Sequence, residues 1–131
     1  MIKFEFNKLI RHKIQDRMLS EGITVNSSVL SPEEYILKLK EKLFEEAGEV
    51  ESAEKVNDLK TELADVLEVI YALASAYKIN FSEIEKARLE KREVNGEFMH
   101  NNYINYIEVE KDNTKVINYL RNKDRHYKLE G

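Results

Sequence analysis

The sequence predicts a mainly α-helical protein, a helical bundle with minor β segments. Two long stretches, 32–55 and 57–78, repeat apolar residues at helical spacing, so that each presents one apolar face. Almost no chain separates these stretches, which favours two antiparallel neighbouring helices. Patterns typical of strands are short by comparison and lie at 2–6, 23–30 and 103–110. The helices are therefore expected to set the fold.

The first thirty residues combine two extended patterns with one helix. Residues 2–6, IKFEF, alternate apolar and polar side chains as a strand does. The segment 7–13 leads into a helix that runs to about Ser20, and Gly22 provides its stop. Residues 23–30 mix β-branched and polar side chains, which indicates an extended segment.

The three long helices each have a start signal. Ser31 precedes Pro32 and stands three residues before Glu34, which predicts a capped helix start with a capping box. Asn57 is expected to cap the second helix. A third helix is expected to begin after a cap at Asn80 or Ser82 and to run to about Val94, before the natural stop of Asn95-Gly96.

Composition and length predict one domain, and the chain ends with a short helix expected near 114–122 and a charged tail. The 131 residues carry a net charge of -4, which gives no indication of nucleic-acid binding, and contain no cysteine for disulfides or thiolate metal sites. The longest apolar run, 66–77, is too short for a membrane span, and the N-terminus has no signal-peptide pattern. We expect a soluble cytoplasmic protein that binds neither membrane nor nucleic acid.

Four acids carry the strongest functional signal in the two long helices. Glu46 with Glu49, and Glu62 with Asp65, are three residues apart, so each pair shares a helix face. At about 1.5 Å of rise per residue, the first pair lies roughly 12 Å before the turn and the second roughly 8 Å after it. The two pairs are therefore nearly level. Glu46 also falls on the apolar arc of its helix, with Glu49 at the edge and Glu45 outside it.

Converging carboxylates repel one another and are costly to desolvate. Either a cation lies among them, or some are protonated or turned outward. Carboxylate oxygens suit Mg²⁺ or Mn²⁺, and neither helix contains the His or Cys that would favour zinc. Most acids in proteins are simply solvated, but two level pairs with one member on an apolar arc favour a metal site.

Basic residues cluster before the first helix and late in the third long helix. Acids that hold a metal, faced by Lys and Arg, suit a polyphosphate. The alternative for each basic residue alone is an ordinary surface charge. The first cluster is Lys8, Arg11 and Lys13, and the second is Arg88, Lys91 and Arg92. The scattered histidines, His12, His100 and His126, are assigned no role.

Three segments in this order resemble the MazG-like all-α nucleoside triphosphate pyrophosphohydrolases, in their phosphoribosyl-ATP pyrophosphohydrolase-like branch. The two acid pairs, with twelve residues between them, match the ExxE…ExxD pattern of that superfamily. NKLIRHKI at 7–14 is similar to its NKLVRDKI segment, and KREVNGEF at 91–98 is similar to its KR..RGGF segment. The likeness covers about residues 7–110, which implies a domain at 1–110 and a C-terminal extension at 111–131. It departs at His12, Gln15 and Asn95, where the family has Asp, Pro and Arg.

The resemblance implies Mg²⁺-dependent cleavage of a nucleoside triphosphate, or a related phosphoanhydride, to a monophosphate and pyrophosphate, often to remove non-canonical nucleotides. By position, the metal ligands would be Glu46, Glu49, Glu62 and Asp65. The candidate phosphate contacts would be Lys8, Arg11, Lys13, Lys91 and Arg92. Family members form dimers or tetramers through the helical layer. A homodimer or homotetramer would explain why the second long helix is apolar almost all round from Leu63 to Tyr77.

Within this hypothesis, Glu46 or its neighbour Glu45 would orient or deprotonate the attacking water. A second hypothesis is a non-catalytic, metal-stabilised helical module for oligomerisation or protein binding. A third, a carboxylate di-iron bundle, is disfavoured because that site needs a Glu-x-x-His pattern, which neither helix contains.

Overall fold

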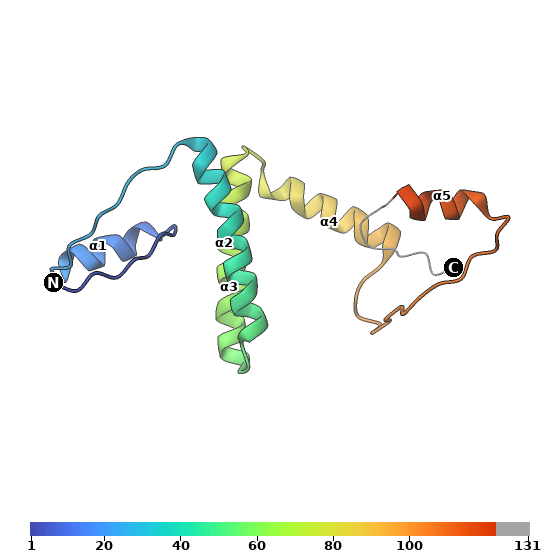
Figure 1. Cartoon of the computed structure of the whole chain (residues 1–131), viewed down its shortest axis with the longest axis horizontal. Coiled ribbons are helices and arrows are strands. Elements are labelled where there is room, and N and C mark those ends of the chain that lie inside the picture. The colour runs from blue at the N-terminus through green and yellow to red at the C-terminus, as the bar shows by residue number, and fades with distance from the viewer. Residues whose placement is uncertain (123–131) are drawn as a thin grey trace. The chain divides into compact units, whose positions relative to one another are not determined.

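A computed structural model of the protein describes residues 1–122. Helices account for the regular structure of this part of the chain (Figure 1), which confirms the predicted mainly α fold. They are α1 (His12–Ser20), α2 (Pro32–Ser52), α3 (Val56–Ala76), α4 (Phe81–Asn95) and α5 (Thr114–Asn122). Within residues 1–122, no helix is long and apolar enough to cross a membrane.

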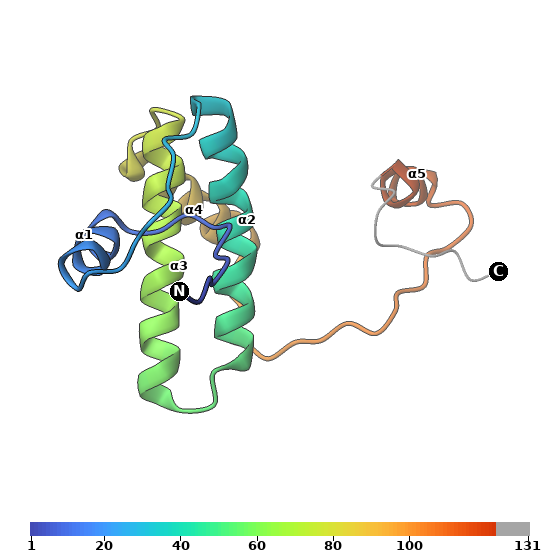
Figure 2. The same cartoon turned by 60° about the vertical axis from the view of Figure 1, so that its left-hand side comes forward.

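The centre of the fold is an antiparallel hairpin of α2 and α3, which lie side by side along their length (Figures 1 and 2). Residues 53–55 join the two helices, as the short break in the sequence predicts. The buried apolar residues of the described chain are Leu39 on α2 and Val69 and Ala74 on α3. The seam between these two helices is therefore the core.

The structure confirms the first helix start and corrects the second. The Ser31 hydroxyl accepts a hydrogen bond of 3.2 Å from the backbone N–H of Glu34, as the capping pattern predicts. The predicted cap at Asn57 is wrong, because α3 begins one residue earlier and its N-cap is Lys55, which has no side-chain cap. The first turn carries Asp58, whose negative charge is favourable at a helix N-terminus.

The local signals at the start of α4 and at the ends of α1 and α4 are confirmed, whereas α2 ends at Ser52 and α3 at Ala76, before the expected ends at about 55 and 78. The Asn80 side chain accepts hydrogen bonds from the backbone N–H and the hydroxyl of Ser82, at 3.0 and 2.9 Å, ahead of α4. The Glu83 carboxylate accepts one of 2.9 Å from the Asn80 backbone, which completes a capping box. Gly22 and Gly96 have φ of +80° and +85°, a conformation that ends a helix at little cost only for glycine.

The structure does not contain the predicted minor β segments within residues 1–122. Residues 2–6, 23–30 and 103–110 belong to no strand in the described part of the chain. Their apolar side chains remain exposed; Phe4, for example, is 78% exposed. The alternating pattern is present, but a strand also needs a neighbour to complete its backbone hydrogen bonds, and within residues 1–122 no backbone hydrogen bond pairs these segments with another extended segment.

The chain divides into two compact units, Met1–Val94 with α1 to α4 and Asn95–Gly131 with α5. The predicted domain boundary after residue 110 stays a prediction. The short helix expected near 114–122 is confirmed as α5. Most of the predicted charged tail, residues 123–131, lies outside the described residues.

Candidate metal centre

Three of the four predicted acids meet across the seam of the hairpin. One carboxylate oxygen from each of Glu46, Glu62 and Asp65 lies within 4.8 Å of the other two, and all three residues are half-buried. We call these residues the acid triad. The level placement expected from helix geometry therefore brings α2 and α3 carboxylates together.

The acid triad fits a hard divalent cation. Its donor set consists of carboxylate oxygens, which Mg²⁺ and Mn²⁺ prefer. Oxygens that share a Mg²⁺ at about 2.1 Å are roughly 3–4 Å apart in an octahedron. The separation of up to 4.8 Å in the triad is slightly larger, so small side-chain rotations bring the oxygens to coordinating distance.

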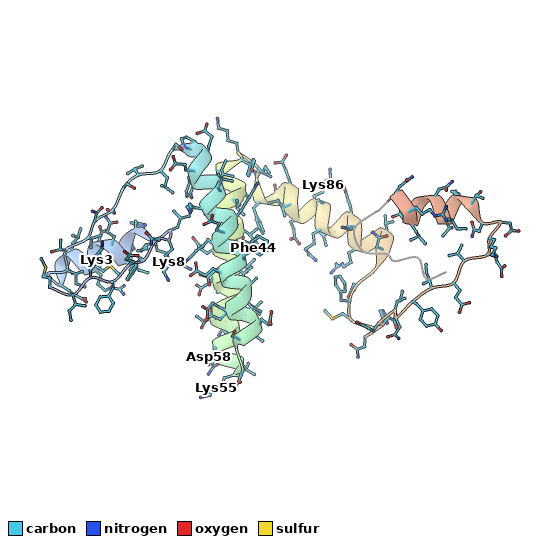
Figure 3. All side chains as sticks on the ribbon, viewed as in Figure 1. Lys3, Lys8, Phe44, Lys55, Asp58 and Lys86 are labelled. Atoms are coloured by element: carbon cyan, nitrogen blue, oxygen red, sulfur yellow. The ribbon has the colours of Figure 1, made fainter. Side chains whose placement is uncertain are left out.

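Glu49, the fourth predicted ligand, is exposed and lies outside the acid triad. Together with Glu62 it lines a shallow depression of about 320 Å³ toward the closed end of the hairpin. Lys55 and Asp58 line the same depression and mark that end in Figure 3. Glu49 is thus the acid that turns outward from the triad, while its charge still acts on Glu62.

The pKa of Glu62 is raised above its ordinary value. Loss of hydration is the largest cause, followed by the negative charge of Asp65 and then of Glu49, Glu46 and Asp58. The nearby carboxylates therefore penalise ionisation of Glu62. A cation among these acids removes that penalty.

The segment before α1 places an arginine on the acid triad. Nη2 of Arg11 donates a hydrogen bond of 2.8 Å to Oδ1 of Asp65. Lys8 of the same segment lies beside the hairpin in Figure 3, with its Nζ 3.6 Å from Oε1 of Glu45. Two of the predicted phosphate contacts are therefore beside the acids, and each is paired with a carboxylate.

Lys42 is a third cation at the cluster and is not among the site residues predicted from the sequence. Its Nζ lies 3.2 Å from Glu45 and 3.6 Å from Glu46, and its side chain is only 21% exposed. The spacing could have predicted these ion pairs, because Lys42 precedes the two acids by three and four residues on one helix. Glu45, the alternative water-activating residue, is thereby held by two ammonium groups outside the triad.

The remaining predicted phosphate contacts lie elsewhere. Within residues 1–122, neither Lys13 nor Lys91 forms an ion pair with the acid triad. Arg92 is in the last turn of α4, where its charge helps to lower the pKa of Glu85, after the larger effect of the hydrogen bond from Arg88. The phosphate-binding roles of Lys13, Lys91 and Arg92 stay predictions.

No protein-family model, curated protein or solved structure matches the chain. The resemblance to the MazG-like pyrophosphohydrolases therefore rests on the three sequence segments and stays a prediction.

Proposed function

We propose that the protein is a Mg²⁺-dependent nucleoside triphosphate pyrophosphohydrolase, with Mn²⁺ as an alternative metal. The products would be a nucleoside monophosphate and pyrophosphate, and the substrates would include non-canonical nucleotides. The observation that carries the proposal is the acid triad, held between two helices and bordered by Arg11 and Lys8. An anionic substrate would thus meet carboxylates for its metal and cations for its phosphates at one place.

The half-buried carboxylates have distinct roles in this proposal. Glu62 and Asp65 would hold the metal with Glu46, and rotation of Glu49 would add a fourth ligand. A bound Mg²⁺ would supply positive charge and Lewis acidity at the phosphates. Glu46 is the preferred residue for orienting the attacking water, because its side chain is 13% exposed and it belongs to the triad. Glu45 is disfavoured because two lysines already pair with it.

The outer phosphates need cationic partners, and the N-terminal segment supplies them. Arg11 has a guanidinium fork suited to phosphate oxygens, and Lys8 adds a point charge. The further proposed phosphate contacts are Lys13 on α1 and Lys91 and Arg92 on α4. Pyrophosphate is a good leaving group when such cations share its charge.

We also propose that the protein acts as a homodimer or homotetramer. Leu63, Leu67 and Tyr71 recur at four-residue spacing on α3 and are 47%, 50% and 48% exposed. The apolar surface of α3 is therefore wider than α2 covers. The same surface supports the alternative function, a non-catalytic module for oligomerisation or protein binding, so catalysis is the property that separates the two.

Hydrolysis in ¹⁸O-water with a panel of nucleoside triphosphates and Mg²⁺ tests the reaction. Attack at the α-phosphorus should place the label in the nucleoside monophosphate, with pyrophosphate as the other product and little free phosphate. Label in pyrophosphate would place attack on the β-phosphorus instead. Diphosphate and orthophosphate as first products would contradict the pyrophosphohydrolase proposal. The double variant Glu62→Gln, Asp65→Asn is the control for contaminating activity and should be inactive.

A further inference from the structure

Arg11 pairs with one of the three carboxylates that would bind a metal. Its guanidinium donates to Oδ1 of Asp65, a carboxylate that also belongs to the acid triad. Arg11 and a divalent cation therefore both use the negative charge of Asp65.

We propose that Arg11 is the resident counter-ion of the acid triad and that it leaves Asp65 when a divalent cation binds there. The exchange rests on the metal-binding part of the proposed function and adds a conformational consequence to it. The N-terminal segment is docked on the hairpin in the metal-free protein and is released in the metal-bound protein.

The contacts that dock this segment are weak enough to exchange. The side chains of Arg11 and Asp65 are 57% and 33% exposed, and those of Lys8 and Glu45 are 47% and 37% exposed. Ion pairs with such exposure contribute roughly 0–1 kcal/mol each, because water screens them. A divalent cation carries twice the charge of Arg11 and is shared by three carboxylates, so its attraction to the triad is the larger one.

Apolar anchoring of the segment is also slight. Leu9 lines an open hollow of about 460 Å³ together with residues of the 28–32 connection and Tyr35 of α2. Leu9 and Leu30 are half-buried, and Val29 beside them is fully exposed. The hollow is wide for the side chains that line it, so the segment moves without the loss of a close-packed core.

Release of Arg11 means that the metal binds before the polyphosphate does. The guanidinium neutralises the acids while the metal is absent, and it becomes free for phosphate oxygens only once the metal has taken its place. Metal binding should therefore raise the affinity for a polyphosphate, and by thermodynamic linkage a polyphosphate should raise the affinity for the metal.

The experiment compares Mn²⁺ binding to the nucleotide-free full-length protein and two variants by isothermal titration calorimetry at low ionic strength. Arg11→Gln removes the proposed competitor. Arg17→Gln removes the same charge from α1, at a position that makes no ion pair with the acid triad within residues 1–122. We expect Arg11→Gln to bind Mn²⁺ about two- to five-fold more tightly than wild type, which is the fold-change equivalent of the ion pair that it deletes. Arg17→Gln should bind as wild type does.

A second measurement follows Arg11 itself. In ¹⁵N-labelled wild type, addition of Mg²⁺ should shift the Nε–Hε resonance of Arg11, assigned by its loss in Arg11→Gln, and leave that of Arg17 in place. Arg11→Lys keeps a positive charge and should restore much of the competition in the calorimetric titration.

Each other result has a definite meaning. Equal tightening in Arg11→Gln and Arg17→Gln would show a general charge effect and overturn the exchange. Weaker Mn²⁺ binding in Arg11→Gln would show that Arg11 positions Asp65 for the metal, which also overturns it. Unchanged binding in Arg11→Gln would overturn the exchange and leave the metal centre standing. Failure of all variants to bind Mn²⁺ would overturn the metal centre as well.

Discussion

The carboxylate of Glu46 lies between Lys42, one turn earlier on α2, and the two acids of α3. Glu46→Gln keeps the size of the side chain and removes one of the repelling charges. We expect the variant to fold, to be slightly more stable than wild type without metal, and to lose pyrophosphohydrolase activity by orders of magnitude. Circular dichroism and pyrophosphate release measure the two properties.

Glu41→Gln is the matched control, because Glu41 lies on α2, is exposed and pairs only with Lys38 among the described residues. It should retain activity. Full activity in a well-folded Glu46→Gln protein would remove Glu46 from the mechanism and favour the non-catalytic alternative.

The raised pKa of Glu62 gives a second prediction at this scale, on metal-free protein in EDTA. A carboxyl whose pKa rises on folding binds its proton more tightly in the native state than in the unfolded state. The resulting stabilisation is present at low pH and is lost as the pH rises from the ordinary value of 4.5 through the raised pKa. Glu62→Gln should remove the part of this loss of stability with rising pH that Glu62 causes. Urea unfolding at several pH values tests it, and an unchanged pH dependence in the variant would contradict it.

Individual positions at the site were predictable only in part. The spacing of Glu46, Glu62 and Asp65 predicted their meeting, because helix rise and a short turn fix where those residues lie. The outward turn of Glu49 depends on which edge of α2 faces α3, which periodicity gives only approximately. The contact from Arg11 was not predictable, since an irregular segment carries it and no repeat fixes the path of such a segment.

At the scale of elements, α2 has two faces that differ in burial. Leu39 is 4% exposed in the seam, whereas Leu37, two residues earlier, is 60% exposed on another face. Leu39→Ala should lower the free energy of unfolding by about 2–5 kcal/mol, because it leaves a cavity in the core. Leu37→Ala, the same change at an exposed site, should lower it by no more than about 0.5 kcal/mol. Urea unfolding of both variants measures the difference, and equal losses would contradict the assigned seam.

Most elements defined by local signals were predicted correctly, with the cap at Asn57 as the exception, and those that need distant partners were not. The Ser31 cap, the Asn80 cap and the stops at Gly22 and Gly96 depend on a few neighbouring residues, and each is present. The segments 2–6, 23–30 and 103–110 have side-chain patterns typical of strands, but the structure shows no strand there. A strand forms only when two segments pair, and the pattern of one segment does not determine its partner.

At the scale of the whole molecule, the apolar surface of α3 predicts self-association. The chain has a mass of 15.4 kDa, so light scattering after size exclusion should give a multiple of that value. Leu67→Glu places a charge in the middle of the exposed stripe and should shift the mass toward 15.4 kDa.

Thr61→Glu is the control for that experiment, since Thr61 is exposed on α3 about 120° around the helix from Leu67. It should leave the mass unchanged. A wild-type mass of 15.4 kDa at all concentrations would contradict the homo-oligomer.

The connection of residues 53–55 also determines how the chain reaches its native state. Contacts across the seam start beside this connection and grow outward, so their sequence separation is small at first. Proteins dominated by such local contacts fold in microseconds to milliseconds. The acids face each other within the half of the hairpin that is nearer the connection, and their repulsion opposes the pairing of the two helices there. Salt or Mg²⁺ should therefore accelerate refolding in a stopped-flow experiment, because the charges that would serve catalysis also oppose the growth of these contacts.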